Sequence, residues 1–122
     1  MKKNNSKKLT IVQVLPALDS GGVERGTLEI SKYLVSKEHR SIVISEGGRM
    51  SKKLIQEGGE HIKLPIGKKS LLTLRIIPKL IKIFIKNNVD IIHIRSRFPA
   101  WICFIATSFI PHKKKPFIVT TF

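Results

Sequence analysis

Two short segments of the chain carry residues that could bind an anion. The first is residues 21–25 (GGVER), which follow an apolar strand-like run and open an amphipathic helix. A first helical turn offers unpaired amides and the positive end of the helix dipole, and glycine lets a ligand approach the backbone closely. This order predicts a phosphate pocket at Gly21 and Gly22. A plain tight turn, capped by Asp19 or Ser20, is the alternative interpretation.

Two charged residues follow the glycines in this first segment. Glu24 stands in the first helical turn, where a carboxylate complements the helix dipole. Arg25 could reach an anionic acceptor, because a guanidinium can donate two parallel hydrogen bonds to a phosphate. Ordinary surface charge is the alternative for both residues, so their part in binding is a hypothesis.

The second segment, residues 93–97 (HIRSR), closes another strand-like run. Arg95 and Arg97, on either side of Ser96, could hold an anionic acceptor, although a solvated loop explains them equally well. His93 suits either a position in a cleft or a hydrogen-bonded position in the core. No second ligand stands at a useful spacing from His93, so no metal site is predicted.

The elements that must position these segments alternate along the chain. Strands are predicted at residues 9–15, 41–45, 61–64, 90–94 and 117–121, and helices at 23–37, 50–57, 71–88 and 100–109. This alternation predicts an α/β, Rossmann-like open parallel sheet of about five strands in the order 3-2-1-4-5, with helices on both faces. Ligands in such sheets bind at the carboxyl ends of the strands, beside the switch point. The turn at 19–22 and the loop at 93–97 should then face each other between the first and fourth strands.

Helical spacing also predicts which large side chains are buried. Trp101, Phe104 and Phe109 share a predicted helix and are expected in the core. The apolar positions of the first helix fall mostly on one stripe, which is expected to face the core: Val23, Leu28, Ile30, Tyr33, Leu34 and Val35.

The net charge of +15 at pH 7 comes from 23 Lys and Arg residues against 8 Asp and Glu residues. Nucleic acid, an anionic membrane surface or a phosphorylated substrate could each be the partner of such a chain. Nucleic acid is not predicted, because aromatic residues are few and do not interleave with the basic ones. A lysine-rich composition with no specific partner is the alternative to a face that binds anionic lipid.

The 122 residues are enough for one domain with a hydrophobic core. Residues 1–8 are expected to form a disordered basic lead-in, and residues 9–122 the domain. The single cysteine, Cys103, lies in an apolar stretch, which predicts a buried, inert thiol and a reducing, cytoplasmic location. No uninterrupted apolar stretch reaches the roughly 20 residues that a membrane span needs.

In the order of these motifs, the chain resembles the N-terminal domain of the family 4 glycosyltransferases, which have the GT-B architecture. SGGVERGTLEISKYL at 20–34 is similar to the family's Gly-Gly-x-Glu-Arg run into a helix. DIIH at 90–93 is similar to its Asp-hydrophobic-hydrophobic-His, and PFIVTTF at 116–122 to the strand before its His-Gly or His-Asp pair. A short helix that ends in glycine before a strand closing at Leu64-Pro65 also fits. The likeness covers residues 9–122.

The resemblance implies the N-terminal half of a retaining glycosyltransferase of hexosyltransferase type. Such an enzyme moves a sugar from a nucleotide-sugar donor to a glycan or lipid-linked acceptor in cell-envelope polysaccharide synthesis. This half would mainly recognise the acceptor and lend its glycine loop to the donor phosphates. No cofactor is implied beyond the nucleotide-sugar as co-substrate. The location would be cytoplasmic, with a peripheral position at the inner face of the cytoplasmic membrane as a further expectation.

Two departures from the family pattern limit what the resemblance implies. Arg95 stands where the family often has a second histidine, and the sequence ends at Phe122, where a further histidine would follow. The C-terminal donor-binding domain is also missing, so catalytic residues stay unassigned and the isolated chain is expected to be inactive. A non-catalytic Rossmann-like binding module, or a truncated product that needs a separate C-terminal half, is the alternative.

Overall fold

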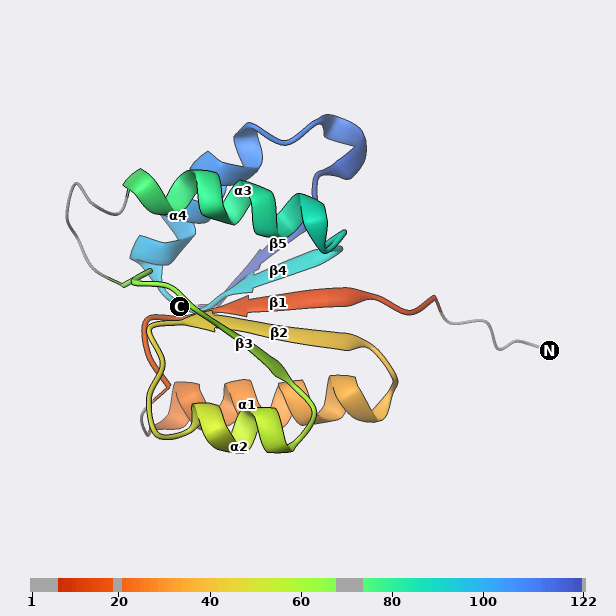
Figure 1. The fold of residues 1–122 in the computed structure, drawn as a ribbon, viewed down its shortest axis with the longest axis vertical. Coiled ribbons are helices and arrows are strands. Elements are labelled where there is room, and N and C mark those ends of the chain that lie inside the picture. Colours follow the sequence, from red (N-terminus) through yellow and green to blue (C-terminus); the bar gives the residue numbers. More distant parts are fainter. Residues whose placement is uncertain (1–6, 19–20, 68–73, 122) are drawn as a thin grey trace.

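The computed structural model of the protein describes residues 7–18, 21–67 and 74–121. Its centre is a parallel sheet, whose strands are β1 (Thr10–Val14), β2 (Arg40–Ser45), β3 (Glu60–Lys63), β4 (Ile91–Ile94) and β5 (Phe117–Thr120). The strand order is β3-β2-β1-β4-β5, and every neighbouring pair is parallel (Figure 1). The predicted strand order is therefore confirmed. Helices α1 (Gly22–Ser36) and α2 (Ser51–Gln56) cover one face, and α3 (Ile76–Lys86) and α4 (Arg97–Ser108) cover the other.

The sheet separates two hydrophobic clusters of different size. The larger lies between the sheet and helices α3 and α4, and includes Val12, Val14, Ile42, Leu80, Phe84 and Ile92. The smaller lies under α1 and α2, and consists of Leu15, Leu18, Leu28, Val43 and Leu54, with Met50 packed against it. Both faces of the central strands are covered, so their sequences are nearly continuous apolar runs.

Two prolines explain where helices α3 and α4 begin. Pro78 and Pro99 each occupy the third helical position, where a backbone amide has no partner within the helix. The helix predicted at 71–88 therefore begins later, at Ile76, and residues 71–73 lie outside the described part. The helix predicted at 100–109 begins earlier, at Arg97, so the loop expected there is shorter than predicted.

The prediction that the aromatic residues of α4 belong to the core is wrong. Trp101 and Phe109 are each 68% exposed, and Phe104 is also exposed. The helix turns smaller residues toward the sheet, and its apolar sequence carries no polar face that would reveal its orientation. On α1, Leu28 is buried as expected, whereas Val23, Ile30 and Tyr33 are exposed, because the helix packs through Thr27, Leu28 and Ser31.

Two further expectations about the chain can be compared with the structure. Cys103 is buried, and burial raises the pKa of its thiol to about 12, as expected of an inert cysteine. Among the described residues, no helix is both long and apolar enough to cross a membrane. Most of the expected disordered lead-in lies outside the described residues, but Lys8 comes within 3.6 Å of the Glu38 carboxylate.

Candidate functional site

The two candidate segments lie at the same edge of the sheet. Gly21 and Gly22 follow β1, and Arg95 follows β4, which is the parallel neighbour of β1. The carboxyl ends of parallel neighbours meet at one edge, and the starts of α1 and α4 share that edge in Figure 1. Asp19 and Ser20, the other part of the predicted turn, lie outside the described residues.

Gly21 is required by the backbone itself. It precedes the first residue of α1 with φ 141° and ψ 177°, a combination that is essentially restricted to glycine. Its carbonyl accepts a hydrogen bond from the amide of Arg25 at 3.0 Å. An added Cβ would lie 3.2 Å from Oε1 of Glu24, whose side chain folds back over this turn. The N-cap of α1 is Gly21, and it makes no side-chain hydrogen bond to the helix. The predicted caps, Asp19 and Ser20, lie outside the described residues.

Gly22 differs from Gly21 because the fold does not require a glycine there. An added Cβ would meet no atom within 4 Å, and its φ lies outside the left-handed region. Gly22 is also the first residue of α1, so its exposed backbone stands at the positive end of the helix dipole. A side chain at this position would therefore point into open space.

Arg95 is held across the sheet by a buried glutamine. Its Nε and Nη2 donate to Oε1 of Gln13 at 3.1 and 2.9 Å, while Nε2 of Gln13 donates to the carbonyl of Thr27 in α1 at 3.1 Å. The amide of Arg95 also donates to the carbonyl of Val14 at 3.0 Å. Burial lowers the pKa of Arg95, but a guanidinium stays charged at neutral pH. These bonds link β4, β1 and α1 and fix a positive charge at the carboxyl edge.

His93 lies on the same face of the sheet as this pair, because it is the register partner of Gln13. Its Nε2 is 3.0 Å from Oγ1 of Thr121, the residue that follows β5. Burial, and then the charge of Arg95, lower the pKa of His93. The lowered pKa favours a neutral imidazole at pH 7, which can accept a hydrogen bond from a hydroxyl group or donate one to it.

The other predicted site residues are not gathered at this point. Arg25 lines a separate pocket between α1 and α2, together with Lys32 and Lys53. Arg97 is the first residue of α4 and lines a pocket with Trp101 and Phe104. Ser96 precedes α4 in an extended conformation, without a side-chain cap to the helix. Glu24 remains beside Gly21, as described above.

Sequence reasoning missed two residues of the site, Gln13 and Thr121. Gln13 is completely buried, and the only sequence signal for it is an amide inside an apolar strand. A buried glutamine needs hydrogen-bond partners, but the sequence alone does not show which residues they are. Thr121 has no sequence signal of its own, because its contact with His93 depends on the pairing of β4 and β5.

The turn after β1 is braced by the neighbouring turn after β2. The amide of Leu18 donates to the carbonyl of Gly47 at 3.0 Å, and the amide of Met50 donates to the carbonyl of Leu18 at 2.8 Å. Ser45, at the end of β2, accepts from the amide of Gly47 and lies 2.8 Å from Nε2 of His61. The segment that leads from β1 toward Gly21 is therefore hydrogen-bonded to the turn that follows β2.

Taken together, these residues can bind an anion and a hydroxyl-bearing group side by side. The α1 N-terminus and Arg95 favour negative charge, and His93 with Thr121 offers neutral hydrogen-bonding groups. Within the described ranges, no three His, Cys, Asp or Glu side chains are grouped so that they could hold a metal ion.

Comparisons with known proteins bear on the fold and the family of the chain. The sequence model of Glycosyltransferase Family 4 matches residues 20–122. A solved glycosyltransferase from Rickettsia africae ESF-5 is 43% identical, with a TM-score of 0.82 over 96% of this chain and 30% of that protein. The C-terminal domain of a Pyrococcus furiosus hydrogenase has a TM-score of 0.66 at 13% identity, over 98% of this chain and 96% of that one, and so shares the fold alone. No curated protein matches the sequence.

Proposed function

Because the chain belongs to Glycosyltransferase Family 4, we propose that it is the acceptor-side half of a retaining glycosyltransferase. This enzyme would transfer a hexose from a nucleotide-sugar to a glycan or lipid-linked acceptor, as a step of polysaccharide synthesis. The observation that supports the proposal is that Gly22 and Arg95 follow two neighbouring parallel strands, β1 and β4, at their carboxyl ends beside the switch point of the sheet.

In this proposal, the α1 N-terminus receives the donor diphosphate. Charge develops on the departing diphosphate during transfer, and amides and cations that are already oriented stabilise it without reorganisation. Gly22 contributes an approachable amide, and Gln13 keeps the Arg95 guanidinium in place. The donor sugar would then lie toward His93, whose neutral imidazole can bind a hydroxyl.

The chain spans 30% of the length of the Rickettsia africae glycosyltransferase. We therefore propose that transfer needs a donor-binding half in addition to these residues, and that the 122-residue chain alone does not turn over. The alternative function is a non-catalytic binding module that acts only together with a separate partner half. We further propose a peripheral position at the inner face of the cytoplasmic membrane, where a lipid-linked acceptor would be reached.

Two glycine variants test the phosphate role in a chimera, in which this chain replaces the matched part of the Rickettsia africae enzyme. Gly22→Val should lower transfer from UDP- or GDP-hexoses at least about tenfold, because the side chain blocks approach to the amide. Gly26→Val is the matched control, since an added Cβ at Gly26 also meets no atom within 4 Å. Equal activity of the two variants would remove Gly22 from the site.

The stereochemistry of the product tests the mechanism separately. A retaining enzyme gives a glycosidic bond with the anomeric configuration of the donor, which NMR of the purified product reports. An inverted configuration would contradict the proposed mechanism while leaving the phosphate site intact. A chimera that binds UDP- and GDP-hexoses but transfers none of them would favour the binding module.

A further inference from the structure

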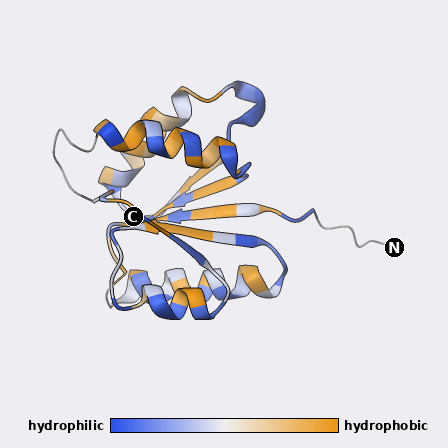
Figure 2. Cartoon of the chain, viewed as in Figure 1, coloured by the Kyte–Doolittle hydropathy of each residue, from blue (hydrophilic) through white to orange (hydrophobic). Residues whose placement is uncertain are grey.

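The central strand β1 carries a glutamine in a run that is otherwise apolar after Thr10. Figure 2 shows the strands of the sheet as mainly hydrophobic, interrupted by short hydrophilic segments. Gln13 is completely buried, and burying an amide costs free energy unless its polar atoms find hydrogen-bond partners. An amide at the centre of the sheet therefore needs an explanation beyond packing.

The two partners of Gln13 leave only one orientation for its amide group. Nε2 faces the carbonyl oxygen of Thr27, which can only accept a hydrogen bond, at 3.1 Å. Oε1 faces Nε and Nη2 of Arg95, which can only donate, at 3.1 and 2.9 Å. A flipped amide would set donor against donor and acceptor against acceptor. Helix α1 therefore determines which end of Gln13 meets the guanidinium.

The partner of Arg95 is neutral, although buried charges are ordinarily paired with an opposite charge. Within the described ranges, the half-buried Arg95 side chain makes no ion pair, and burial is the cause that lowers its pKa. The same charge contributes to lowering the pKa of the neighbouring His93. Gln13 thus orients the positive charge at this edge of the sheet without neutralising it.

From this arrangement we infer that Gln13 is a positioning residue, which directs the charge of Arg95 at a phosphate group of the donor while leaving that charge intact. The inference deepens, and rests on, the proposed function, in which Arg95 and the α1 N-terminus receive the donor diphosphate. Because one amide is bonded to both α1 and Arg95, the two parts of the site keep a fixed relative position, as stabilisation without reorganisation requires. A glutamate at position 13 would also hold Arg95, but it would neutralise the charge that the diphosphate needs.

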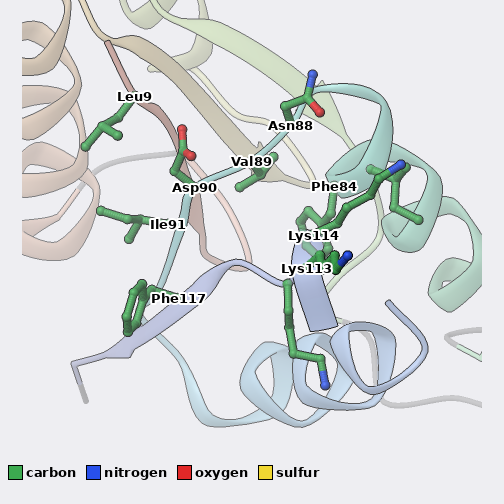
Figure 3. A pocket seen from close by; sticks show the side chains of 11 residues that line it. Leu9, Phe84, Asn88, Val89, Asp90, Ile91, Lys113, Lys114 and Phe117 are labelled. Atoms are coloured by element: carbon green, nitrogen blue, oxygen red, sulfur yellow. The ribbon is translucent and has the colours of Figure 1, made fainter. Parts of the chain in front are cut away.

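A second group of cations lies at the opposite edge of the sheet. Lys113 and Lys114, in the short helix η2 (His112–Lys114), line a recess of about 460 Å³ beside Phe117, the first residue of β5. In Figure 3, the two lysine side chains reach along one side of this recess, and Phe117 lies on the other side. Arg95, in contrast, follows the carboxyl end of β4. The recess lysines therefore serve as a control for nonspecific attraction of anions.

Binding of inorganic pyrophosphate to the 122-residue chain tests the role of charge without requiring transfer. In an NMR titration, the backbone amide signal of Gly22 and the Nε–H signal of Arg95 should shift. Gln13→Glu should weaken this binding at least about tenfold, whereas Lys113→Gln with Lys114→Gln should weaken it less than about twofold. Equal weakening by both changes, or no shift of the Arg95 signal in the wild-type chain, would overturn the inference.

A double-mutant cycle tests whether Gln13 acts through Arg95. In the chimera with the Rickettsia africae enzyme, Gln13→Met removes the hydrogen bonds but leaves the charge of Arg95. This variant should lower kcat/KM for UDP- or GDP-hexoses several-fold, and Arg95→Met should lower it at least about tenfold. The double variant should be no worse than Arg95→Met alone, because the glutamine then has no cation to position. Losses that simply multiply would contradict a positioning role.

Ser41→Ala is the matched control for a general disturbance of the α1 layer. Ser41 is also buried under α1, and its hydroxyl lies 2.6 Å from Oγ of Ser31, away from both candidate segments. This variant should lower stability but leave pyrophosphate binding and kcat/KM unchanged. A loss of binding as large as that of Gln13→Met would overturn the inference. Circular dichroism checks folding, and if Gln13→Met is unfolded, the comparison of Gln13→Glu with the wild-type chain decides.

The two assays separate this inference from the proposed function. Sugar transfer by the chimera that is unaffected by Gln13→Glu would count against the positioning role only. Pyrophosphate binding that responds to Gln13→Glu, together with a chimera that transfers no sugar, would count against the proposed function only.

Discussion

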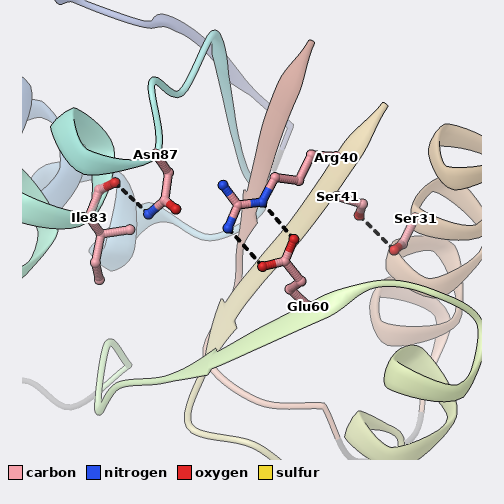
Figure 4. A network of polar contacts seen from close by, with 6 residues as sticks. All are labelled: Ser31, Arg40, Ser41, Glu60, Ile83 and Asn87. Carbon is pink, nitrogen blue, oxygen red and sulfur yellow. Dashed lines mark hydrogen bonds and ion pairs between the residues drawn. The ribbon is translucent and has the colours of Figure 1, made fainter. Parts of the chain in front are cut away.

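The two helical layers of the molecule are attached to one sheet by different chemistry. Helix α1 buries Thr27, Leu28 and Ser31, and Oγ of Ser31 lies 2.6 Å from Oγ of Ser41 in β2 (Figure 4). Helix α3 instead buries only apolar residues, among them Leu80 and Phe84. The α1 layer thus combines a small apolar cluster with directional hydrogen bonds, whereas the buried contacts of α3 are apolar only. Directional bonds suit the layer that carries the glycine turn, because they define where its first amides point.

The same layers also differ in how their surface charges are arranged. Between α1 and α2, Lys32 Nζ lies 3.8 Å from a carboxylate oxygen of Glu57. Helices α3 and α4 contain no acidic residue. Arg40, which donates two hydrogen bonds to Glu60 at 2.6 and 2.8 Å, belongs to the sheet and lies on its α3 face, away from Ser41 (Figure 4). The α1 and α2 helices are therefore joined by an ion pair, whereas α3 and α4 present cations and aromatic residues outward.

Shortening a core side chain should cause the largest loss of stability, and the loss should differ between the two hydrophobic clusters. Phe84→Ala should lower the free energy of unfolding by about 3–5 kcal/mol, because it leaves a cavity in the larger cluster. Leu54→Ala in the smaller cluster should cost about 2–4 kcal/mol. Guanidinium denaturation of both variants measures this order. A larger loss for Leu54→Ala than for Phe84→Ala would show that the smaller cluster contributes more to stability than the larger one.

Variants of the buried serine pair measure how much its hydrogen bond contributes to the stability of the α1 layer. Ser31→Ala or Ser41→Ala should each cost about 1–2 kcal/mol, because the remaining hydroxyl loses its partner, and the double variant should cost less than their sum. Urea denaturation of the three variants completes the cycle. In the other layer, Cys103→Ser places an unpaired hydroxyl in an apolar site and should cost about 1–3 kcal/mol. Strict additivity of the serine variants would contradict a direct bond.

The pH dependence of stability should arise mainly from the α1 face of the sheet. His61 and His93 both have pKa values lowered by burial, so the unfolded chain binds protons more readily than the folded one. Stability is then complete above the unfolded imidazole pKa of about 6.5 and decreases as the pH falls below it. Denaturation midpoints measured from pH 7.5 to 5 report this decrease. His93→Gln should flatten it, and an unchanged slope would contradict the contribution of His93.

Single surface charges should have the smallest effects on stability, and a paired charge should matter more than an unpaired one. Arg40→Ala removes the pair with Glu60 and should cost about 0.2–1 kcal/mol, less at high salt, because both side chains are largely exposed. Lys82→Ala should change stability by less than about 0.5 kcal/mol, since α3 has no acidic partner for it. Thermal unfolding at two salt concentrations compares them. A larger cost for Lys82→Ala would reveal a structural role for the basic surface.

The fold was largely predictable because it follows from local patterns. Buried parallel strands require nearly continuous apolar runs, such as residues 10–14, and the turns between them are marked by glycine and proline. Parallel strands and right-handed crossovers then leave few possible orders. Helix starts were less predictable, since Pro99 fits within a first turn as well as before one.

The candidate site was predictable only in its location. Strand and turn patterns brought Gly22 and Arg95 to one edge, because the carboxyl ends of neighbouring parallel strands coincide. The sequence patterns could not show that Gln13 accepts hydrogen bonds from Arg95, or that Arg25 lines a pocket beside α2. Both contacts depend on how the side chains pack in the folded protein.

The amino-acid sequence by itself determined the order of the strands, the glycine turn and the excess of positive charge, because each follows from residue type and spacing. The tertiary structure alone decided which side of α4 faces water and which residues meet across long separations. An apolar helix has no polar side to fix its rotation, so packing against the sheet exposes Trp101 and Phe109. The bond between Gln13 and Arg95 joins residues 82 positions apart, and it exists only because β1 and β4 are neighbours.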